Sequence, residues 1–280
     1  MAFPPGHFYS PIPDLTEVRA RHDSIFAKPP SLPGIDLRTS SQLELAQALS
    51  AFAADQPFSD YPVEGLRYGF VNDFFSYGDG IVLHTMLRHL RPRRYVEIGS
   101  GWSSALALDT IDRFLAGVTR CTFIEPYPDR LAGLLLDADA ARTDIEVLNV
   151  PLYQIGSEIF ESLESGDVLF IDSTHVSRVG SDVNQIFFDI LPILPAGVHV
   201  HIHDVFWPFE YPSGWVYDGR AWSESYLLRA YLTHNPRIRI DWFNQYLAAF
   251  HWAEVAAALP LWERNTGGSI WLQTVAPVPV

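Results

Sequence analysis

The middle of the chain alternates between short apolar runs and longer segments in which apolar residues recur every three or four positions. Such runs predict strands, and such segments predict helices. Residues 168–171 are apolar throughout, which is typical of a strand buried on both faces. The pattern predicts strands at 94–98, 121–125, 145–150, 168–172, 198–204, 237–243 and 269–274, and helices at 40–54, 81–90, 103–116, 129–137, 154–163, 181–194 and 223–233. Strands that alternate with helices indicate an α/β fold with a doubly wound, mostly parallel sheet.

Prolines set the N-terminal part of the chain apart, since nine of the 21 fall within the first 62 residues. Proline interrupts helices and central strands, so residues 1–60 are predicted to form a proline-rich arm with one helix near 40–54. The apolar residues of this arm indicate packing on the following domain or on a second copy of the chain in a homo-oligomer. Residues 61–280 are predicted to form one domain, in which the aromatic, proline-broken stretch 206–235 is an insertion on the substrate side.

A glycine turn follows the first predicted strand and leads into a helix, with the sequence Glu97-Ile-Gly-Ser-Gly101. Gly99 and Gly101 let the backbone turn sharply and approach a ligand closely. The helix start leaves free N–H groups that point toward the same place. We expect a nucleotide-type ligand to be bound here by Glu97, Gly99, Ser100, Gly101 and Ser103.

Two acids refine the character of this ligand. Glu97, which we place inside the turn, would repel a pyrophosphate and attract a cationic ligand. Glu125 closes the second predicted strand, where an acid can accept hydrogen bonds from both hydroxyls of a ribose. Ser104 replaces the third glycine of the dinucleotide fingerprint, which disfavours a nicotinamide cofactor.

The motifs at 97–101, at Glu125 and at 167–175 resemble those of the class I S-adenosylmethionine-dependent methyltransferases. The resemblance extends over residues 65–275, and the segments 170–175 and 201–205 are similar to a bacterial branch that includes small-molecule O-methyltransferases. It implies a Rossmann-like sheet of seven strands with an antiparallel last hairpin, S-adenosylmethionine as cofactor, and methyl transfer to a small molecule at oxygen. It also implies cofactor contacts from Asp172, and from Asp79 in a segment that covers the methionine end of the cofactor in related enzymes.

Acids that close the fourth and fifth predicted strands form the candidate metal centre. In catechol-type methyltransferases these two strand ends hold magnesium, which implies metal ligation by Asp172 and Asp204. Val205 stands where those enzymes have an asparagine ligand, and His203 could replace it, which would favour softer ions such as manganese. His203 reaches such an ion only if the strand twists or bulges at its end. The alternative is that both acids orient the substrate without a metal.

Histidines supply the remaining candidate chemistry. His199, His201 and His203 alternate along the fifth predicted strand and therefore share one face. We expect His199 to be a hydrogen-bonded core residue, and His203, nearest the carboxyl end, to act at the site. His175, on the loop after the fourth strand, is a candidate general base or metal ligand. The predicted catalytic residues are therefore Asp172, His175 and His203.

Composition narrows the partners. A net charge of −14 and the lack of any run of five basic residues argue against nucleic acid and anionic membranes, and favour a neutral or small polar acceptor. A single cysteine, Cys121, and an N-terminus unlike a signal peptide favour a reducing cytoplasm. Three rival interpretations stay open: an enzyme that uses the same cofactor for metal-dependent or other chemistry, a nicotinamide-dependent oxidoreductase, and a non-catalytic cofactor-binding subunit.

Overall fold

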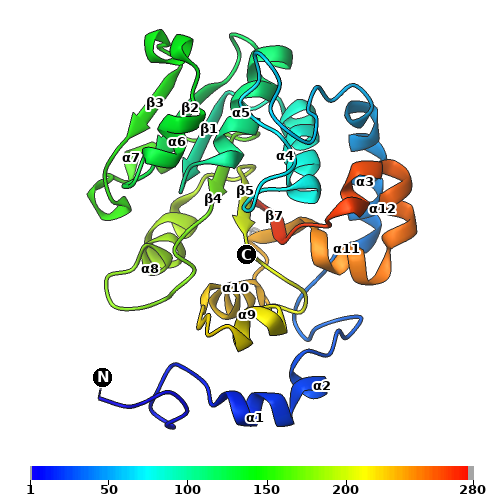
Figure 1. Cartoon of the computed structure of the whole chain (residues 1–280), viewed down its shortest axis with the longest axis vertical. Coiled ribbons are helices and arrows are strands. Elements are labelled where there is room, and N and C mark those ends of the chain that lie inside the picture. The colour runs from blue at the N-terminus through cyan, green and yellow to red at the C-terminus, as the bar shows by residue number, and fades with distance from the viewer. Residues whose placement is uncertain (1, 277–280) are drawn as a thin grey trace.

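The computed structural model describes residues 2–276, and its centre is a seven-stranded sheet with the strand order β3-β2-β1-β4-β5-β7-β6 (Figure 1). The strands are β1 (Arg94–Ile98), β2 (Arg120–Ile124), β3 (Ile145–Leu148), β4 (Val168–Ile171), β5 (His199–His203), β6 (Ile238–Phe243) and β7 (Ser269–Thr274). Strands β1 to β5 pair in parallel, whereas β7 runs antiparallel to both β5 and β6. The predicted mostly parallel sheet with antiparallel last strands is confirmed.

The strand order reverses at the centre of the sheet, because β1 has β2 on one side and β4 on the other. Ligands of open α/β sheets bind at the carboxyl ends of the strands at such a switch point. Ile98 and Ile171, the last residues of β1 and β4, are paired in register. The sheet therefore brings the glycine turn after β1 next to Asp172, which follows β4.

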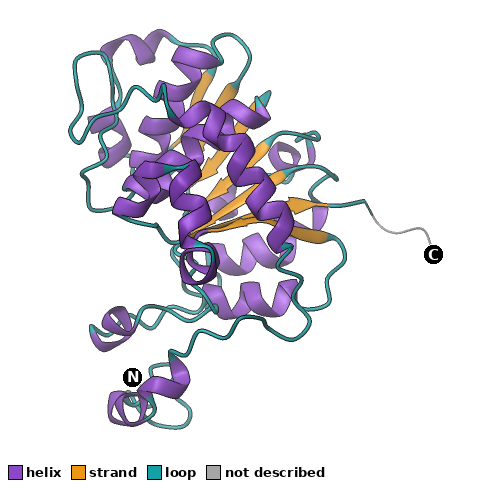
Figure 2. Cartoon of the chain, turned by 90° about the vertical axis from the view of Figure 1, so that its right-hand side faces the viewer, coloured by secondary structure: helices purple, strands orange, loops and turns teal. Residues whose placement is uncertain are grey.

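Helices cover the sheet, which runs behind a layer of them in Figure 2. Most follow the predicted pattern with shifted ends: α3 (Thr39–Ala53), α4 (Tyr77–Leu90), α5 (Trp102–Phe114), α6 (Asp129–Leu134) and α10 (Glu224–Leu232). The segment predicted as a helix at 154–163 instead forms a 3-10 turn, η2 (Leu152–Gln154), and the short α7 (Glu158–Glu161). No helix within residues 2–276 is both long and apolar enough to cross a membrane.

The helix predicted at 181–194 is irregular. It begins as α8 (Asp182–Gln185), where the Ser181 hydroxyl accepts a hydrogen bond from the backbone N–H of Asn184 as an N-cap. It widens into a π-turn, η3 (Ile186–Ile190), and ends in a 3-10 turn, η4 (Leu191–Ile193). Proline 192 lacks an N–H group, so the α-helical hydrogen-bond ladder cannot continue through this end.

Several helices were absent from the sequence prediction. They are α1 (Leu15–Ala20), α2 (His22–Ile25), α9 (Ser213–Tyr217), α11 (Asn244–Phe250), α12 (Trp252–Ala258) and the 3-10 turns η1 (Asp137–Ala141) and η5 (Pro260–Arg264). The expectation of one helix in residues 1–60 was therefore wrong. Each of these elements has at most seven residues, too few for a 3.6-residue period to stand out.

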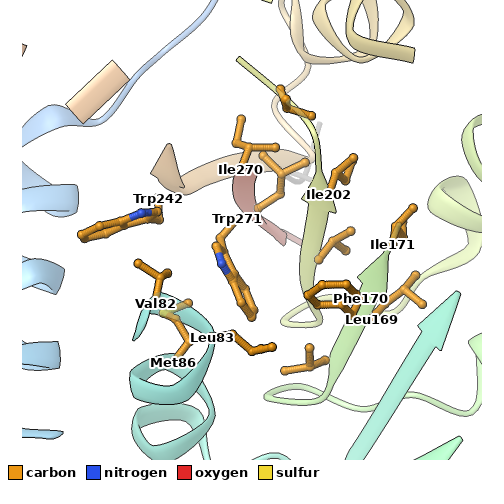
Figure 3. Close-up of a cluster of buried hydrophobic side chains, with 14 of the residues drawn as sticks. Val82, Leu83, Met86, Leu169, Phe170, Ile171, Ile202, Trp242, Ile270 and Trp271 are labelled. Carbon is orange, nitrogen blue, oxygen red and sulfur yellow. The ribbon is translucent and has the colours of Figure 1, made fainter. Parts of the chain in front are cut away.

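The core lies between α4 and the strands β4, β5 and β7. Trp271 of β7 is fully buried and extends toward Leu83 and Met86 of α4, with Phe170 of β4 on its other side (Figure 3). All four side chains of β4 are fully buried, as the continuous apolar run predicted. This packing fixes the carboxyl ends of β4 and β5, which carry the candidate chemistry.

Residues 2–26, which we call the N-terminal segment, bury little of themselves and make few contacts with the rest of the described chain. Asp14 caps α1 by accepting hydrogen bonds from the backbone N–H groups of Thr16 and Glu17. His22 Nδ1 lies 2.7 Å from the Tyr217 hydroxyl of α9. The helices α1 and α2 lie beyond α9 and α10, away from the sheet (Figure 1).

Candidate functional site

The glycine turn holds the backbone of β1 against the end of β4. Gly99 has a φ of +78°, and a Cβ at this position would collide with the carbonyl oxygen of Asp172. Only glycine tolerates both the left-handed conformation and this close approach. The backbone N–H of Ser100 donates to Oε2 of Glu125 at 2.9 Å, and that of Gly101 donates to Ser104 Oγ at 2.9 Å.

Glu97 lies within strand β1, and not in the turn as predicted. Its side chain is fully buried, and Oε1 accepts hydrogen bonds from Ser103 Oγ at 2.5 Å and Ser104 Oγ at 3.0 Å. Oε2 is buried and makes no hydrogen bond of ordinary geometry within the described residues, although the Tyr95 hydroxyl, also buried and unpaired, is a neighbour of the carboxyl group. Burial raises the pKa of Glu97 to about 8. A buried carboxylate oxygen without a partner is costly, so this position suits a ligand that brings a cation or a donor.

A cavity of about 490 Å³ opens at the carboxyl ends of β1, β2 and β4, and Gly99, Glu125 and Asp172 all line it. Both oxygens of Glu125 accept backbone hydrogen bonds, from Ser100 at 2.9 Å and from Tyr127 at 2.7 Å. A carboxylate offers about four acceptor positions, so two remain for a ligand. The exposed rings of Tyr127 and Tyr153 also line this cavity.

Asp79 lies in the first turn of α4 and is held by protein groups. Its Oδ1 accepts from Asn244 Nδ2 at 2.9 Å and Ser269 Oγ at 2.6 Å, and its Oδ2 accepts from the Gly268 N–H at 3.0 Å. The residue does not line the cofactor cavity. These bonds tie α4 to the start of β7, which gives Asp79 a structural role in addition to the cofactor contact that the resemblance implied.

Three side chains that follow β4 and β5 and one from the start of α10 form what we call the carboxylate–histidine cluster: Asp172, His175, Asp204 and Glu224. His175 Nδ1 lies 2.8 Å from Glu224 Oε2, and Nε2 lies 3.3 Å from Asp172 Oδ1 and 3.6 Å from Asp204 Oδ2. Carboxylates only accept hydrogen bonds, so this arrangement favours a proton on each ring nitrogen. Burial opposes that charge, but the hydrogen bonds to Asp172 and Glu224 outweigh it and raise the pKa of His175 to about 10.

Two members of the cluster have strained backbones. His175 has a φ of +60° and Asp204 a φ of +55°, although neither is glycine. Such conformations cost about 1–3 kcal/mol each and persist where the surrounding structure enforces them, which is common at functional sites. The carbonyl oxygen of His175 accepts hydrogen bonds from the backbone N–H groups of Ser223 at 2.9 Å and Glu224 at 3.1 Å, which hold its loop in place.

The predicted metal site would have to form within this cluster. A divalent cation bound by Asp172 and Asp204 would need the point that the two carboxylates share. Nε2 of His175 faces both acids there, so a cation at this point would have to displace the proton that the two carboxylates favour on that nitrogen. Within residues 2–276, no three His, Cys, Asp or Glu side chains are arranged to hold a metal. The imidazole already supplies positive charge between the two acids.

The three histidines of β5 share one face, as predicted. His199 lies 3.2 Å from Asp241 and 3.0 Å from Gln273, which makes it a hydrogen-bonded core residue. His201 is fully buried against the ring of Phe170, with ring centroids 4.0 Å apart, and burial lowers its pKa well below the usual value.

His203 is nearest the carboxyl end of β5. The left-handed φ of Asp204 turns its carboxylate toward this residue, with 3.7 Å between His203 Nε2 and Asp204 Oδ1. β5 pairs regularly with β7 as far as His203, so the backbone changes direction only at Asp204, after the histidine. Burial opposes a charge on His203, but Asp204 and Asp172 outweigh it and raise its pKa.

Sequence reasoning missed Glu224, which begins α10 and is 1% exposed. Its other oxygen, Oε1, accepts a hydrogen bond from Ser173 Oγ at 2.9 Å. A buried acid at a predicted helix start was the available signal, but its histidine partner lies 49 residues earlier in the chain.

Residues 96–205 match a family model described as a methyltransferase domain. An uncharacterised protein of Archaeoglobus fulgidus is 36% identical over 168 residues, which cover 58% of this chain and 74% of that protein.

Solved structures similar to this chain include two methyltransferases. One is the O-methyltransferase TomG from Streptomyces achromogenes in complex with S-adenosylmethionine, with 18% identity, coverage of 93% of this chain and 96% of that chain, and a TM-score of 0.46. The other is the Podospora anserina methyltransferase PaMTH1 bound to S-adenosylhomocysteine, with 15% identity, coverage of 94% and 95%, and a TM-score of 0.44.

The family model spans the glycine turn, Glu125 and the ends of β4 and β5, which build the cavity and supply every residue of the cluster except Glu224. The strand order, with its switch point next to Gly99, is that of a sheet that binds a nucleotide-type ligand at the carboxyl ends of its strands. The chain belongs to the class I S-adenosylmethionine-dependent methyltransferase family.

Proposed function

We propose that this enzyme methylates a hydroxyl group of a small-molecule acceptor at the carboxylate–histidine cluster. The observation that carries the proposal is the position of Asp172, which lines the cofactor cavity and also faces His175 within the cluster. A ligand in the cavity and a second ligand at the cluster would therefore meet at this residue.

Residues of the cavity suit the cofactor. Glu125 can accept from ribose hydroxyls, and Tyr127 and Tyr153 offer aromatic faces to a base. Glu97 is buried behind the lining, next to the glycine turn, and its free oxygen suits an ammonium group that reaches it. When bound, S-adenosylmethionine supplies a methyl group already activated on a sulfonium. The protein then has to orient the acceptor and take up its proton.

Asp204 is the proton acceptor in this proposal. His175, protonated between its carboxylate partners, has no lone pair to offer, and Asp172 is on the cofactor side. Asp204 does not line the cofactor cavity, and burial raises its pKa, which makes it a stronger base than an exposed aspartate. His175 is a positioning residue that fixes both aspartates and places positive charge near the developing oxyanion.

A metal-assisted reaction, which the resemblance implied, would require His175 to give up its Nε2 proton or to leave the point between Asp172 and Asp204. We propose that the His175 imidazolium, in place of a metal ion, balances the negative charge of Asp172 and Asp204. Turnover should then survive thorough chelation, whereas Asp204→Asn should lower it by at least about a hundredfold, the typical contribution of a general base. Activity lost on chelation and restored by magnesium or manganese would favour the metal.

Binding and product analysis test the function itself. Calorimetry should show S-adenosylmethionine binding that weakens about tenfold or more in Glu125→Ala, because a hydrogen bond to a charged group contributes about 1.5–3 kcal/mol. Assays with a panel of phenols and alcohols should yield S-adenosylhomocysteine and a methylated product. Equal affinity in the variant would remove Glu125 from the site, and reduction of a nicotinamide without S-adenosylhomocysteine would favour the oxidoreductase alternative.

A further inference from the structure

A second cavity, of about 740 Å³, lies between the N-terminal segment and the stretch 206–235. The N-terminal segment lines it with six residues: Pro11, Ile12, Pro13, Val18, Ile25 and Phe26. The opposite side includes Val176, Tyr211, Val216, Trp222 and Tyr226. Figure 1 shows the corresponding arrangement, with α1 and α2 facing α9 and α10. An apolar and aromatic lining of this size is typical of small-molecule sites.

This cavity adjoins the carboxylate–histidine cluster. The rings of Trp222 and His175 have centroids 4.5 Å apart, so the indole that lines the cavity also packs against the cluster. Val176, which follows His175 directly, is part of the lining. Arg178 lines this cavity and the cofactor cavity, so the two meet at its segment. The second cavity therefore lies on the acceptor side of the cofactor.

Two guanidinium groups, those of Arg178 and Arg220, line the cavity. Neither takes part in an ion pair within the described part of the chain. Arg220 lies over the rings of Trp215 and Trp222, 4.2 Å and 5.2 Å from their centroids. Glu210 is the acid in the lining, and its Oε1 accepts hydrogen bonds from the Tyr226 hydroxyl and from the backbone N–H of Tyr211.

Arginines without carboxylate partners are notable in a chain with a net charge of −14. A guanidinium group beside aromatic rings in a largely apolar cavity can bind an anion through paired N–H donors while a flat molecule packs against the rings. The neutral or small polar acceptor expected from the overall charge does not use these groups.

We infer that the second cavity binds the methyl acceptor, and that this acceptor is an aromatic acid whose anionic group is recognised by Arg178 and Arg220. The identification of this ligand as the methyl acceptor rests on the proposed function. The binding of an aromatic anion in this cavity does not depend on it. The N-terminal segment then forms one wall of the acceptor site, with Ile25 and Phe26 in contact with the apolar body.

Fluorescence titration with 8-anilinonaphthalene-1-sulfonate, an aromatic anion, tests the binding directly. The neutral N-phenyl-1-naphthylamine is the matched probe. The full chain should bind the anion at one saturable site, and Arg178→Met and Arg220→Met should each weaken it about tenfold while the neutral probe changes less than twofold. Arg229→Met, an exposed position on α10 outside the lining, is the control and should leave both probes unchanged.

Two further measurements locate and define the site. Ile25→Asp, in the wall formed by the N-terminal segment, should weaken both probes. In competition, 4-hydroxycinnamate should displace the anion at a concentration at least tenfold lower than its amide. Circular dichroism checks that each variant is folded. If only one of the two arginine variants folds, its affinity for the anionic probe is enough to test the inference.

The outcomes separate the two proposals because no titration requires methyl transfer. Equal anion affinity in both folded arginine variants, or equal potency of acid and amide, would overturn the inference whatever the enzyme's activity. Binding as expected, without S-adenosylhomocysteine from any aromatic acid, would leave the cavity as an anion site and reject its role for the acceptor.

Discussion

Glu97 has an unpaired buried oxygen and a pKa raised to about 8 by burial, so at pH 7 it is mainly protonated. A cationic cofactor beside it would favour the carboxylate. We therefore predict that S-adenosylmethionine binding at pH 7 releases up to one proton, and that affinity rises with pH until about pH 8 and then levels off. Calorimetry in buffers of different ionisation enthalpy measures the release.

Glu97→Gln is the control for this prediction, and it should abolish the proton release. Stability gives a second check on the sign. The pKa of Glu97 in the folded protein lies above the value of about 4.3 in the unfolded chain. The free energy of unfolding should therefore fall as pH rises from about 4 toward 8, and it should fall less in Glu97→Gln. Proton release that persists in the variant would assign it to another group.

Glu224 acts through His175, and its removal should separate positioning from binding. Glu224→Gln removes a carboxylate that favours the imidazolium, so the pKa of His175 should fall from about 10. Turnover should fall at least tenfold while cofactor affinity stays within twofold, because Glu224 does not line the cofactor cavity. NMR titration of the imidazole and separate kcat and KM values check this. An unchanged His175 titration would contradict the coupling.

The sequence was informative about residues whose positions follow from a strand end. Glu125 and Asp172 were placed correctly because each directly follows a recognisable apolar run. The bounds of the strand that contains Glu97 were predicted correctly, but assigning its side chain to the turn was wrong, because the carboxylate points into the protein and is buried. The role of Glu224 depends on a contact across 49 residues, and no local pattern contains that information.

At the scale of elements, a helix or strand can be predicted from the sequence when its own burial pattern is visible there. The strand at 168–171 could be predicted because all four side chains are buried and therefore apolar. The short helices α11 and α12 depend on tertiary contacts instead. Asn244 at the start of α11 accepts hydrogen bonds from the indole N–H groups of Trp242 and Trp262 and donates to Asp79. Contacts between distant segments hold these turns, so periodicity could not predict them.

Trp271 gives an element-scale prediction, because it joins β7 to α4 in the core (Figure 3). Trp271→Ala should lower the free energy of unfolding by about 3–5 kcal/mol through lost burial and the cavity left behind. Trp252, with 44% of its surface exposed, is the matched position, and Trp252→Ala should cost clearly less. Urea unfolding of both variants measures the difference. Equal losses would mean that the packing around Trp271 can close over the gap.

At the scale of the whole molecule, the N-terminal segment is held to the domain by few contacts. No residue of α1 or α2 is buried, and Phe8 and Tyr9 are 81% and 66% exposed. Its contacts include His22 with the Tyr217 hydroxyl, and Arg19 stacked over the Tyr217 ring at 3.9 Å. Exposed aromatic side chains on a segment that buries little of itself suit contact with a second copy of the chain.

We therefore predict that the full chain is a homo-oligomer and that removal of residues 1–26 lowers its mass in solution. The domain itself should lose little stability, since the segment contributes no buried side chain from α1 or α2. Light scattering coupled to gel filtration gives the mass, and a thermal melt of the same samples gives the stability. A Phe8→Ser, Tyr9→Ser variant should shift the mass in the same direction, because it removes apolar area without shortening the chain. An unchanged mass with a clearly lower melting temperature would show that the segment packs on its own domain and that these aromatic residues serve no second copy.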